Sequence, residues 1–194
     1  NLNRRGGHYR LFLKHGKSQR SLIEWKRKQL DAITGMEINE FSQKVKGKPY
    51  KFCQFVTLTH PAFTDLHNVF YRGRNKIVPA HIKELTTNPL ALAVWIMDDG
   101  ARAGAGMTIQ THSFSKTGVE RLRKMLKENF RLTVSLRKNK ERMILYIPKS
   151  EIPRLKMLVG EHILKEYIYK FPNPVETARR GSDVTSDHDT VRTA

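Results

Sequence analysis

The sequence predicts an α+β protein built from two similar halves. Segments in which apolar and polar residues alternate, as in half-buried strands, are interspersed with segments of helical periodicity. The order of strand, basic helix, hairpin and helix occurs twice. Lys17-Ser18 in the first copy and Ser115-Lys116 in the second set the offset at roughly 100 residues, and two copies at that spacing favour paired halves over a solenoid.

The first copy begins with strands over residues 2–15. Tyr9, Leu11 and Leu13 alternate there with mostly charged neighbours, and Gly6-Gly7 provides a turn. A helix is expected over residues 20–33. Its core-facing residues are Leu22, Trp25, Leu30 and Ile33, and its largely solvent-exposed residues are Lys26, Arg27 and Lys28. Residues 36–59 are expected to form further strands around a turn at 46–49. Pro61 then begins a helix that contains Leu66, Val69 and Phe70.

Residues 88–100 predict a buried helix. Asn88 can cap its N-terminus, Pro89 suits the first helical position, and Gly100 suits the helix end. The residues between them are apolar on all sides. This pattern predicts burial on every side of the helix.

The second copy repeats the order of the first. A strand over 107–113 leads into a helix after residues 116–118, and strands over 134–137 and 143–147 enclose a charged turn. Residues 151–153 begin a last helix, and Gly104-Ala105-Gly106 is interpreted as a flexible link. We expect an N-terminal half over 1–87, a C-terminal half over 88–172 and a disordered tail over 173–194.

The charge balance favours a polyanionic partner. The chain has 36 Lys and Arg against 18 Asp and Glu, a formal net charge of +18. A strongly positive surface attracts nucleic acid, because each neutralised phosphate releases a counterion. A ribosome-like or merely basic surface protein remains an alternative on charge alone.

Composition also limits the other classes of partner and site. No apolar run approaches the roughly 20 residues that cross a membrane, so no membrane association is expected. A single cysteine, Cys53, excludes an internal disulfide and a cysteine-rich zinc site, which favours a reducing compartment.

Asp98 and Asp99 end the apolar helix. The C-terminus of a helix carries partial negative charge, which disfavours carboxylates there. A divalent cation would compensate, since hard cations prefer carboxylate oxygen. The alternative is that Asp-Asp-Gly only forms a turn after a core helix, and the pattern alone favours this turn.

Residues 92–100, Leu-Ala-Val-Trp-Ile-Met-Asp-Asp-Gly, resemble the LAGLIDADG motif of homing endonucleases. The match is closest to the subfamily whose second motif has a Trp, a Met and then Asp-Asp-Gly. Residues 111–115 and 146–150 also resemble parts of this subfamily, and the likeness extends over roughly residues 1–172. It implies two αββαββα halves that lay their sheets into the major groove of double-stranded DNA, and an intron-encoded endonuclease that cuts the duplex.

The resemblance also implies roles for individual residues. Asp99, the eighth residue of the motif, would bind the catalytic metal ion, with Mg²⁺ as the expected cofactor. Lys149 falls where the family places a basic residue near the scissile phosphate, and Ser115 falls near a polar position of its solvent network. The sequence therefore predicts Asp99, Lys149 and Ser115 as catalytic residues.

Basic and polar residues on or beside the predicted strands are candidates for DNA contact. Arg and Gln can read base edges, whereas Lys mostly contacts phosphate. For each residue the alternative is a solvated charged face. The candidates are Arg4, Arg5, His8, Arg10, Lys14, Lys17, Gln110, His112, Arg137, Lys138 and Lys140.

The family places strand residues such as 1–4 directly after the Gly of its first motif, so the first motif helix is expected to be absent from this chain. One catalytic carboxylate is then identifiable where the mechanism expects two, as in an inactive fragment, and the complete protein is expected to be a monomer. Relatives of this family also act as intron maturases that bind intron RNA and assist splicing. A maturase, or a relative that only binds nucleic acid, is therefore the alternative function. The compartment stays open between an organelle, either chloroplast or mitochondrion, and the bacterial cytoplasm.

Overall fold

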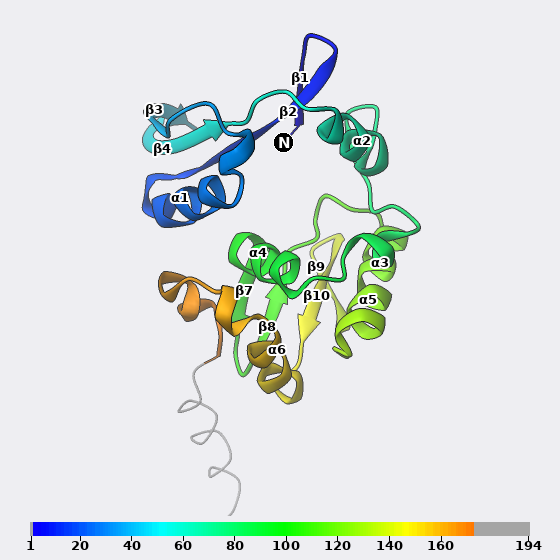
Figure 1. The fold of residues 1–194 in the computed structure, drawn as a ribbon. Helices are drawn as coiled ribbons and strands as arrows, with labels where there is room; N and C mark the ends of the chain where they lie inside the picture. Colours follow the sequence, from blue (N-terminus) through cyan, green and yellow to red (C-terminus); the bar gives the residue numbers. More distant parts are fainter. Residues whose placement is uncertain (1, 173–194) are drawn as a thin grey trace, which may run out of the picture. The chain divides into compact units, whose positions relative to one another are not determined.

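The structure, a computed structural model, describes residues 2–172 (Figure 1). The predicted disordered tail over 173–194 lies outside the described residues. The chain divides into two compact units. Unit 1 comprises Asn1–Ile82 and Ser113–Arg121, and unit 2 comprises Lys83–His112 together with the chain from Leu122 onward. The division at residues 87 and 88 stays a prediction about domains.

Unit 1 contains a four-stranded antiparallel sheet in the order β1-β2-β4-β3, called sheet 1 below. Helix α1 packs on β2 and β4, and helix α2 packs on β2. The elements of this part of the chain are β1 (Leu2–Arg5), β2 (His8–Gly16), η1 (Lys17–Gln19), α1 (Arg20–Gln29), η2 (Asp31–Ile33), β3 (Asn39–Val45), β4 (Lys48–Val56), α2 (Pro61–Phe70), β5 (Tyr71–Arg72) and β6 (Asn75–Lys76).

Unit 2 contains a second four-stranded antiparallel sheet in the order β7-β8-β10-β9, called sheet 2. Both sheets therefore have the same order of strands, which confirms the α+β class and the internal repeat. The remaining elements are α3 (Ile82–Leu85), α4 (Pro89–Asp99), β7 (Gly100–Ala103), β8 (Gly106–Ile109), α5 (Lys116–Phe130), β9 (Ser135–Asn139), β10 (Arg142–Ile147), η3 (Lys149–Glu151), α6 (Ile152–Val159), η4 (Gly160–His162) and η5 (Lys165–Lys170).

Two-residue turns join all four hairpins of these sheets. Each turn contains a residue with positive φ, namely Gly6, Gly47, Gly104 or Lys140. Such turns match the right-handed twist of the flanking strands. The prediction of a flexible link at residues 104–106 was wrong, because Gly104 and Ala105 form the turn between β7 and β8, where Ala103 pairs with Gly106.

Strand alternation gives each sheet a helix-covered face and an open face. In sheet 1 the core beneath the helices contains Ile23, Cys53 and Phe55, with Leu13 packed against them. Neighbouring residues on each strand, such as Lys14 beside Leu13, therefore point to the opposite face. We call this the open face.

Two predictions for helix α1 differ from the structure. The helix ends at Gln29 rather than at residue 33, because a separate 3₁₀ turn follows it. Lys26 is only 6% exposed, and its Nζ lies 3.2 Å from His15 Nε2, so it is not on the solvated side of the helix.

Helix α4 is buried along one side only. Leu92, Ala93, Ile96 and Met97 are 0–1% exposed. On the other side of the helix, Ala91 is exposed, and Leu90, Val94 and Trp95 are half-buried. The prediction of burial on every side is therefore wrong for the described residues. Among residues 2–172, no helix has the length and apolar character needed to cross a bilayer.

Candidate active site and nucleic-acid interface

Helix α4 is delimited by the residues that the sequence singled out. The Asn88 side-chain oxygen accepts a hydrogen bond from Leu90 N at 2.8 Å, and Pro89 is the first helical residue. At the other end the chain leaves the helix in an extended conformation at Gly100. A Cβ at position 100 would lie 2.5 Å from the carbonyl oxygen of Ile96, so the close approach of the backbone requires glycine.

The C-terminus of α4 presents two exposed carboxylates, Asp98 and Asp99. Asp99 is held by sheet 2, since Gln110 N donates to its carbonyl oxygen at 3.0 Å, next to the pairing of Gly100 with Ile109. The backbone of this aspartate is therefore fixed by both the helix and the β7–β8 hairpin.

Lys170 supplies the positive charge that this helix end needs. Its Nζ donates to the carbonyl oxygens of Ile96 at 3.3 Å, Met97 at 2.5 Å and Asp98 at 3.3 Å. The side chain is 6% exposed. The last carbonyls of a helix have no partner within it, and a cation there interacts favourably with the helix dipole. Lys170 thus satisfies these carbonyls directly beside the two carboxylates.

Lys149 lies just beyond the end of β10, where it begins the 3₁₀ turn η3. Strand β10 runs beside β8, with Leu145 level with Ile109, and Gly100, the residue after Asp99, pairs with the same Ile109. Lys149 is exposed, and its catalytic role stays a prediction.

Ser115 has a local structural task. It precedes Lys116, the first residue of α5, and its Oγ accepts a hydrogen bond from Gly118 N at 3.1 Å. Its carbonyl accepts from Val119 N at 2.9 Å. Ser115 therefore caps the N-terminus of α5, and its place in a solvent network stays a prediction.

The predicted DNA contacts of sheet 1 divide between its two faces. Arg10 and Lys14 lie on the open face. Arg4 pairs with Tyr9, whose ring stacks on His67 of α2 at 3.9 Å, so Arg4 lies on the helix-covered face.

Among the other candidates of unit 1, His8 and Lys17 contact neighbouring side chains. Arg5 and His8 flank the first hairpin turn, and His8 Nδ1 lies 3.2 Å from Thr64 Oγ1. Lys17 Nζ forms an ion pair with Glu40 at 2.6 Å. The hydrogen bond from Lys17, together with the nearby Arg20, lowers the pKa of the Glu40 carboxyl below its usual range. The ammonium of Lys17 is thus paired with a carboxylate of the protein itself.

Two candidates of sheet 2, Arg137 and His112, contact neighbouring side chains of the sheet. The Arg137 guanidinium lies 3.1 Å from the ring centroid of Tyr146, and His112 Nε2 lies 3.4 Å from Asn139 Nδ2. Gln110 Oε1 is buried and accepts no hydrogen bond within the described residues. By contrast, Lys138 pairs with Met143 and points to the other face, and Lys140 lies in the hairpin turn.

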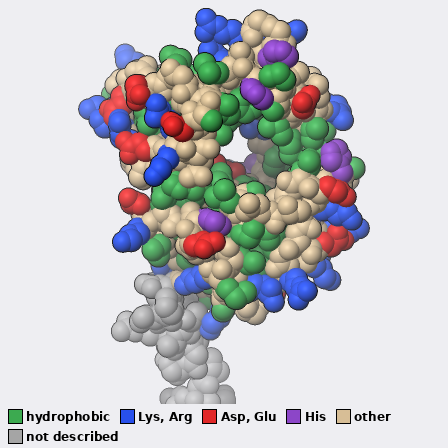
Figure 2. Space-filling model, viewed as in Figure 1, with side chains coloured by type: hydrophobic (Ala, Val, Ile, Leu, Met, Phe, Trp, Pro, Cys, Tyr) green, Lys and Arg blue, Asp and Glu red, His purple; other side chains and the backbone are tan. Residues whose placement is uncertain are grey.

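Figure 2 shows Lys and Arg side chains spread over the visible surface, with fewer Asp and Glu between them.

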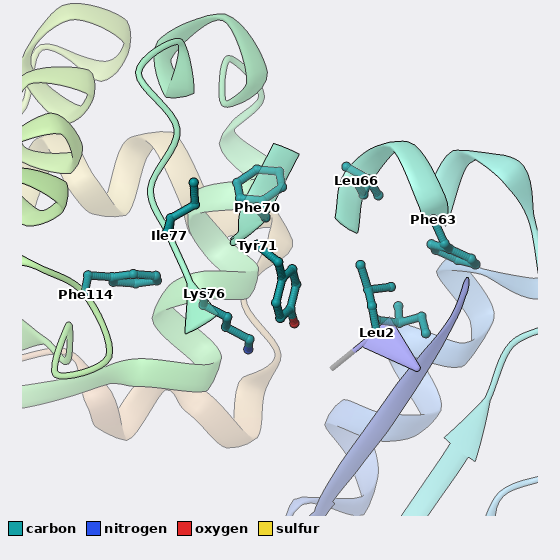
Figure 3. A pocket seen from close by; sticks show the side chains of 9 residues that line it. Leu2, Phe63, Leu66, Phe70, Tyr71, Lys76, Ile77 and Phe114 are labelled. Carbon is teal, nitrogen blue, oxygen red and sulfur yellow. The ribbon is translucent and has the colours of Figure 1, made fainter. Parts of the chain in front are cut away.

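A cavity of about 320 Å³ in unit 1 is lined mostly by apolar side chains (Figure 3). Leu2, Leu11, Phe63 and Phe70 are among its lining residues, and Lys76 brings the one ammonium group. Such an apolar lining suits hydrocarbon rather than phosphate.

Sequence reasoning missed Lys170 and the aromatic residues of the sheet 1 open face. No local pattern marks Lys170, which lies 72–74 residues from the carbonyls that it contacts. The aromatic residues carry a detectable signal, since Phe41, Phe52 and Tyr50 alternate with residues of the helix-covered face.

The sequence matches the model of the LAGLIDADG DNA endonuclease family over residues 1–155. Among curated proteins, it is 32% identical over 137 residues to the cytochrome b mRNA maturase bI2 of Saccharomyces cerevisiae, covering 66% of this chain and 32% of that protein. It is 29% identical over 127 residues to the intron-encoded endonuclease ai4 of Dictyostelium discoideum, covering 63% and 79%. The chain spans about a third to a half of the length of the maturases that it matches.

Among solved structures, the homing endonuclease I-WcaI bound to its DNA recognition sequence has a TM-score of 0.81 and 25% identity to this chain. The alignment covers 88% of this chain and 79% of that one.

Proposed function

We propose that this chain, which belongs to the LAGLIDADG DNA endonuclease family, takes part in the site-specific hydrolysis of double-stranded DNA. The observation that carries the proposal is the end of α4. Two exposed carboxylates lie there, beside a buried lysine that holds the preceding carbonyls. Placing carboxylates at the negative end of a helix costs stability, and such a cost tends to mark a functional site.

The donor set suits Mg²⁺. Among residues 2–172, no group of three or more His, Cys, Asp or Glu could enclose a metal ion. Mg²⁺ does not need such a cage, because it keeps several waters and binds through one or two carboxylates together with phosphate oxygens of the substrate. Asp99 would provide the carboxylate. When bound, the ion would polarise the scissile phosphate and lower the pKa of a bound water.

The chain's own residues would then position the DNA and balance its charge. Asp99 keeps its position because its backbone belongs to both α4 and the edge of sheet 2. Lys170, which contacts the carbonyl oxygen of the neighbouring Asp98, would help to balance negative charge at this helix end, and Lys149 remains the candidate that the motif indicates near the scissile phosphate. The basic open faces of the two sheets would contact phosphates and base edges. Since one chain carries both sheets, we propose that the protein acts on DNA as a monomer.

The test is cleavage by the protein expressed from its complete reading frame. Its target would be selected from a library of randomised plasmid inserts in the presence of Mg²⁺. We expect Asp99→Asn to abolish cleavage while leaving DNA binding intact or tighter, because a ligand is lost and a repulsive charge near phosphate is removed. Asp98→Asn, the matched control at the neighbouring position, should be milder. Cleavage by Asp99→Asn at the wild-type rate would remove the metal assignment.

A second candidate function is supported by the likeness to the yeast maturase. Under it the same basic chain would bind structured intron RNA and assist splicing without cutting DNA. The two candidates differ in a splicing assay with the host intron, in which the endonuclease would have no activity with or without Asp99. A maturase would keep its splicing activity without that carboxylate, and it would bind the intron in preference to duplex DNA of matched length.

A further inference from the structure

The open face of sheet 1 carries aromatic side chains, whereas the solvent-facing side of a strand usually carries polar ones. Phe41 of β3 pairs directly with Phe52 of β4, with ring centroids 5.7 Å apart. The next position along the same face pairs Gln43 with Tyr50, which is 49% exposed. Val45 follows at 41% exposed. Phe41, Phe52, Tyr50 and Val45 form a strip, here called the aromatic strip, on the edge strand β3 and its neighbour β4.

Lys14 of β2 lies over this strip. Its Nζ is 4.1 Å from the ring centroid of Phe52 and 4.9 Å from that of Phe41, and it donates to Gln43 Oε1 at 2.6 Å. The ammonium therefore occupies the ring faces of the two phenylalanines. Because these faces are covered, the strip is poorly suited to stack unpaired bases, which need an open aromatic face. What remains for contact are the edges of the two rings and the exposed side chains of Tyr50 and Val45.

The corresponding face of sheet 2 differs in part. Aligned on the two-residue turns of the β3–β4 and β9–β10 hairpins, Phe52 corresponds to Tyr146 and Tyr50 to Ile144, whereas Phe41 corresponds to Ser135 and Val45 to Asn139. The apolar character of the open face is therefore specific to sheet 1 on its β3 strand, while β9 presents polar groups such as Arg137 and Asn139.

We propose that the aromatic strip of sheet 1 reads thymine methyl groups in the major groove. This inference rests on the proposed binding of duplex DNA. The C5-methyl of thymine is the apolar group among the base edges of the major groove, and phenylalanine is one of the side chains that contact it. Lys14, which lies over the two phenylalanine rings, would provide a cation for phosphate or for the acceptor edge of a neighbouring base. The half of the target that sheet 1 contacts is therefore rich in A·T pairs.

The experiment replaces each thymine of the selected target, one at a time, by deoxyuridine. This change removes the methyl group and keeps the hydrogen-bonding pattern of the pair. Dissociation constants are measured by fluorescence anisotropy with the full protein. We expect a loss of about fourfold for each methyl group that the strip buries. The sensitive positions should be confined to one half of the target.

The protein variants Phe52→Thr and Phe41→Thr should lose that sensitivity. Threonine keeps the β-propensity of the strand, so a folded sheet is expected. Each variant should bind the deoxyuridine target as wild type does, and should bind the thymine target more weakly. Arg137→Gln is the matched control in sheet 2. It should weaken binding yet keep the wild-type response to deoxyuridine.

Each outcome bears either on the reading of thymine methyl groups or on the proposed binding of duplex DNA. Duplex binding with no response to deoxyuridine, or a response that Phe41→Thr and Phe52→Thr both preserve, would overturn the reading of methyl groups while leaving the proposed function intact. Preferential binding of single-stranded RNA through Phe41 and Phe52 would also overturn it. A protein that binds no duplex would remove the proposed function and the inference together.

Discussion

Sheets 1 and 2 share an order of strands and differ in what their open faces offer. Both carry a cation over an aromatic ring, Lys14 over Phe52 and Arg137 over Tyr146, but β3 adds Phe41 and Val45 where β9 has Ser135 and Asn139. The backbone repeat is maintained by its four two-residue turns and by the apolar residues under the helices. The open faces are free of that constraint, so the two halves can recognise different chemistry from the same scaffold.

The largest expected effect concerns the positive charge that the two sheets share. Both are basic, so binding of duplex DNA should weaken steeply with salt, by about 10³–10⁵-fold between 50 and 200 mM if six to ten phosphates are contacted. Fluorescence anisotropy across that range measures the slope. If Arg10 contacts a phosphate, as we propose for the open face of sheet 1, Arg10→Gln should lower the slope by about one. Phe52→Thr should leave it unchanged. Equal slopes for Arg10→Gln and wild type would mean that sheet 1 does not contact phosphate through Arg10.

The next effect belongs to unit 2 alone. Lys170→Met removes the hydrogen-bond donor from three carbonyls at the end of α4, and we expect a loss of about 2–4 kcal/mol in the free energy of unfolding of that unit. Urea denaturation followed by circular dichroism measures it. Lys165→Met, at an exposed position of the same segment, should stay within about 0.5 kcal/mol of wild type. If the two variants unfold alike, Lys170 does not stabilise the helix end.

A smaller effect tests whether the hairpins of the two halves are equivalent. Gly104 and Lys140 both have positive φ, at 61° and 55°, in the two hairpins of sheet 2. Gly104→Ala should destabilise the protein by about 1 kcal/mol, and Lys140→Gly should stabilise it slightly. Gly6→Ala and Lys46→Gly make the same comparison in sheet 1. Thermal unfolding midpoints of the four variants should fall into two pairs by type of substitution, regardless of sheet.

The smallest effect follows from the lone thiol in the core of sheet 1. Burial raises the pKa of Cys53 above its usual range, so the folded state favours the neutral thiol. The stability from this shift is fully present below the unfolded thiol pKa of about 8.5 and is lost as pH rises through the folded value. Unfolding measured from pH 7 to 10 should therefore show an alkaline loss in wild type that Cys53→Ala reduces. The same loss in both proteins would assign it to other groups.

The sequence predicted most of the fold because its signals were local. Alternation marked the strands, Asn88 and Gly100 marked the limits of α4, and Lys46-Gly47 marked a hairpin. The β7 strand was missed because its four residues, Gly-Ala-Arg-Ala, carry little apolar periodicity and adjoin the glycines of the turn. Local patterns are weakest where a short strand gains its stability only by pairing with its neighbour.

Less of the candidate site was predictable, because its contacts are tertiary. The motif identified Asp99, and the structure adds that its backbone is fixed from two sides. The motif also pointed to Lys149, which begins the 3₁₀ turn after β10, and its catalytic role stays a prediction. Lys170 and the burial of Lys26 depend on side chains that meet only after folding, and long charged side chains are otherwise expected at the surface.

Lys170 has a practical consequence for anyone who trims this protein for expression. A chain ending at Leu164 would retain every strand of both sheets and all six α-helices of the described residues, yet it would lack the ammonium that completes α4. Its far-ultraviolet spectrum would resemble that of the intact chain, since the ladders and helices would be present. The carboxylates of Asp98 and Asp99 would then stand on a frayed helix end, so the proposed metal site should be lost from a product whose secondary structure looks intact.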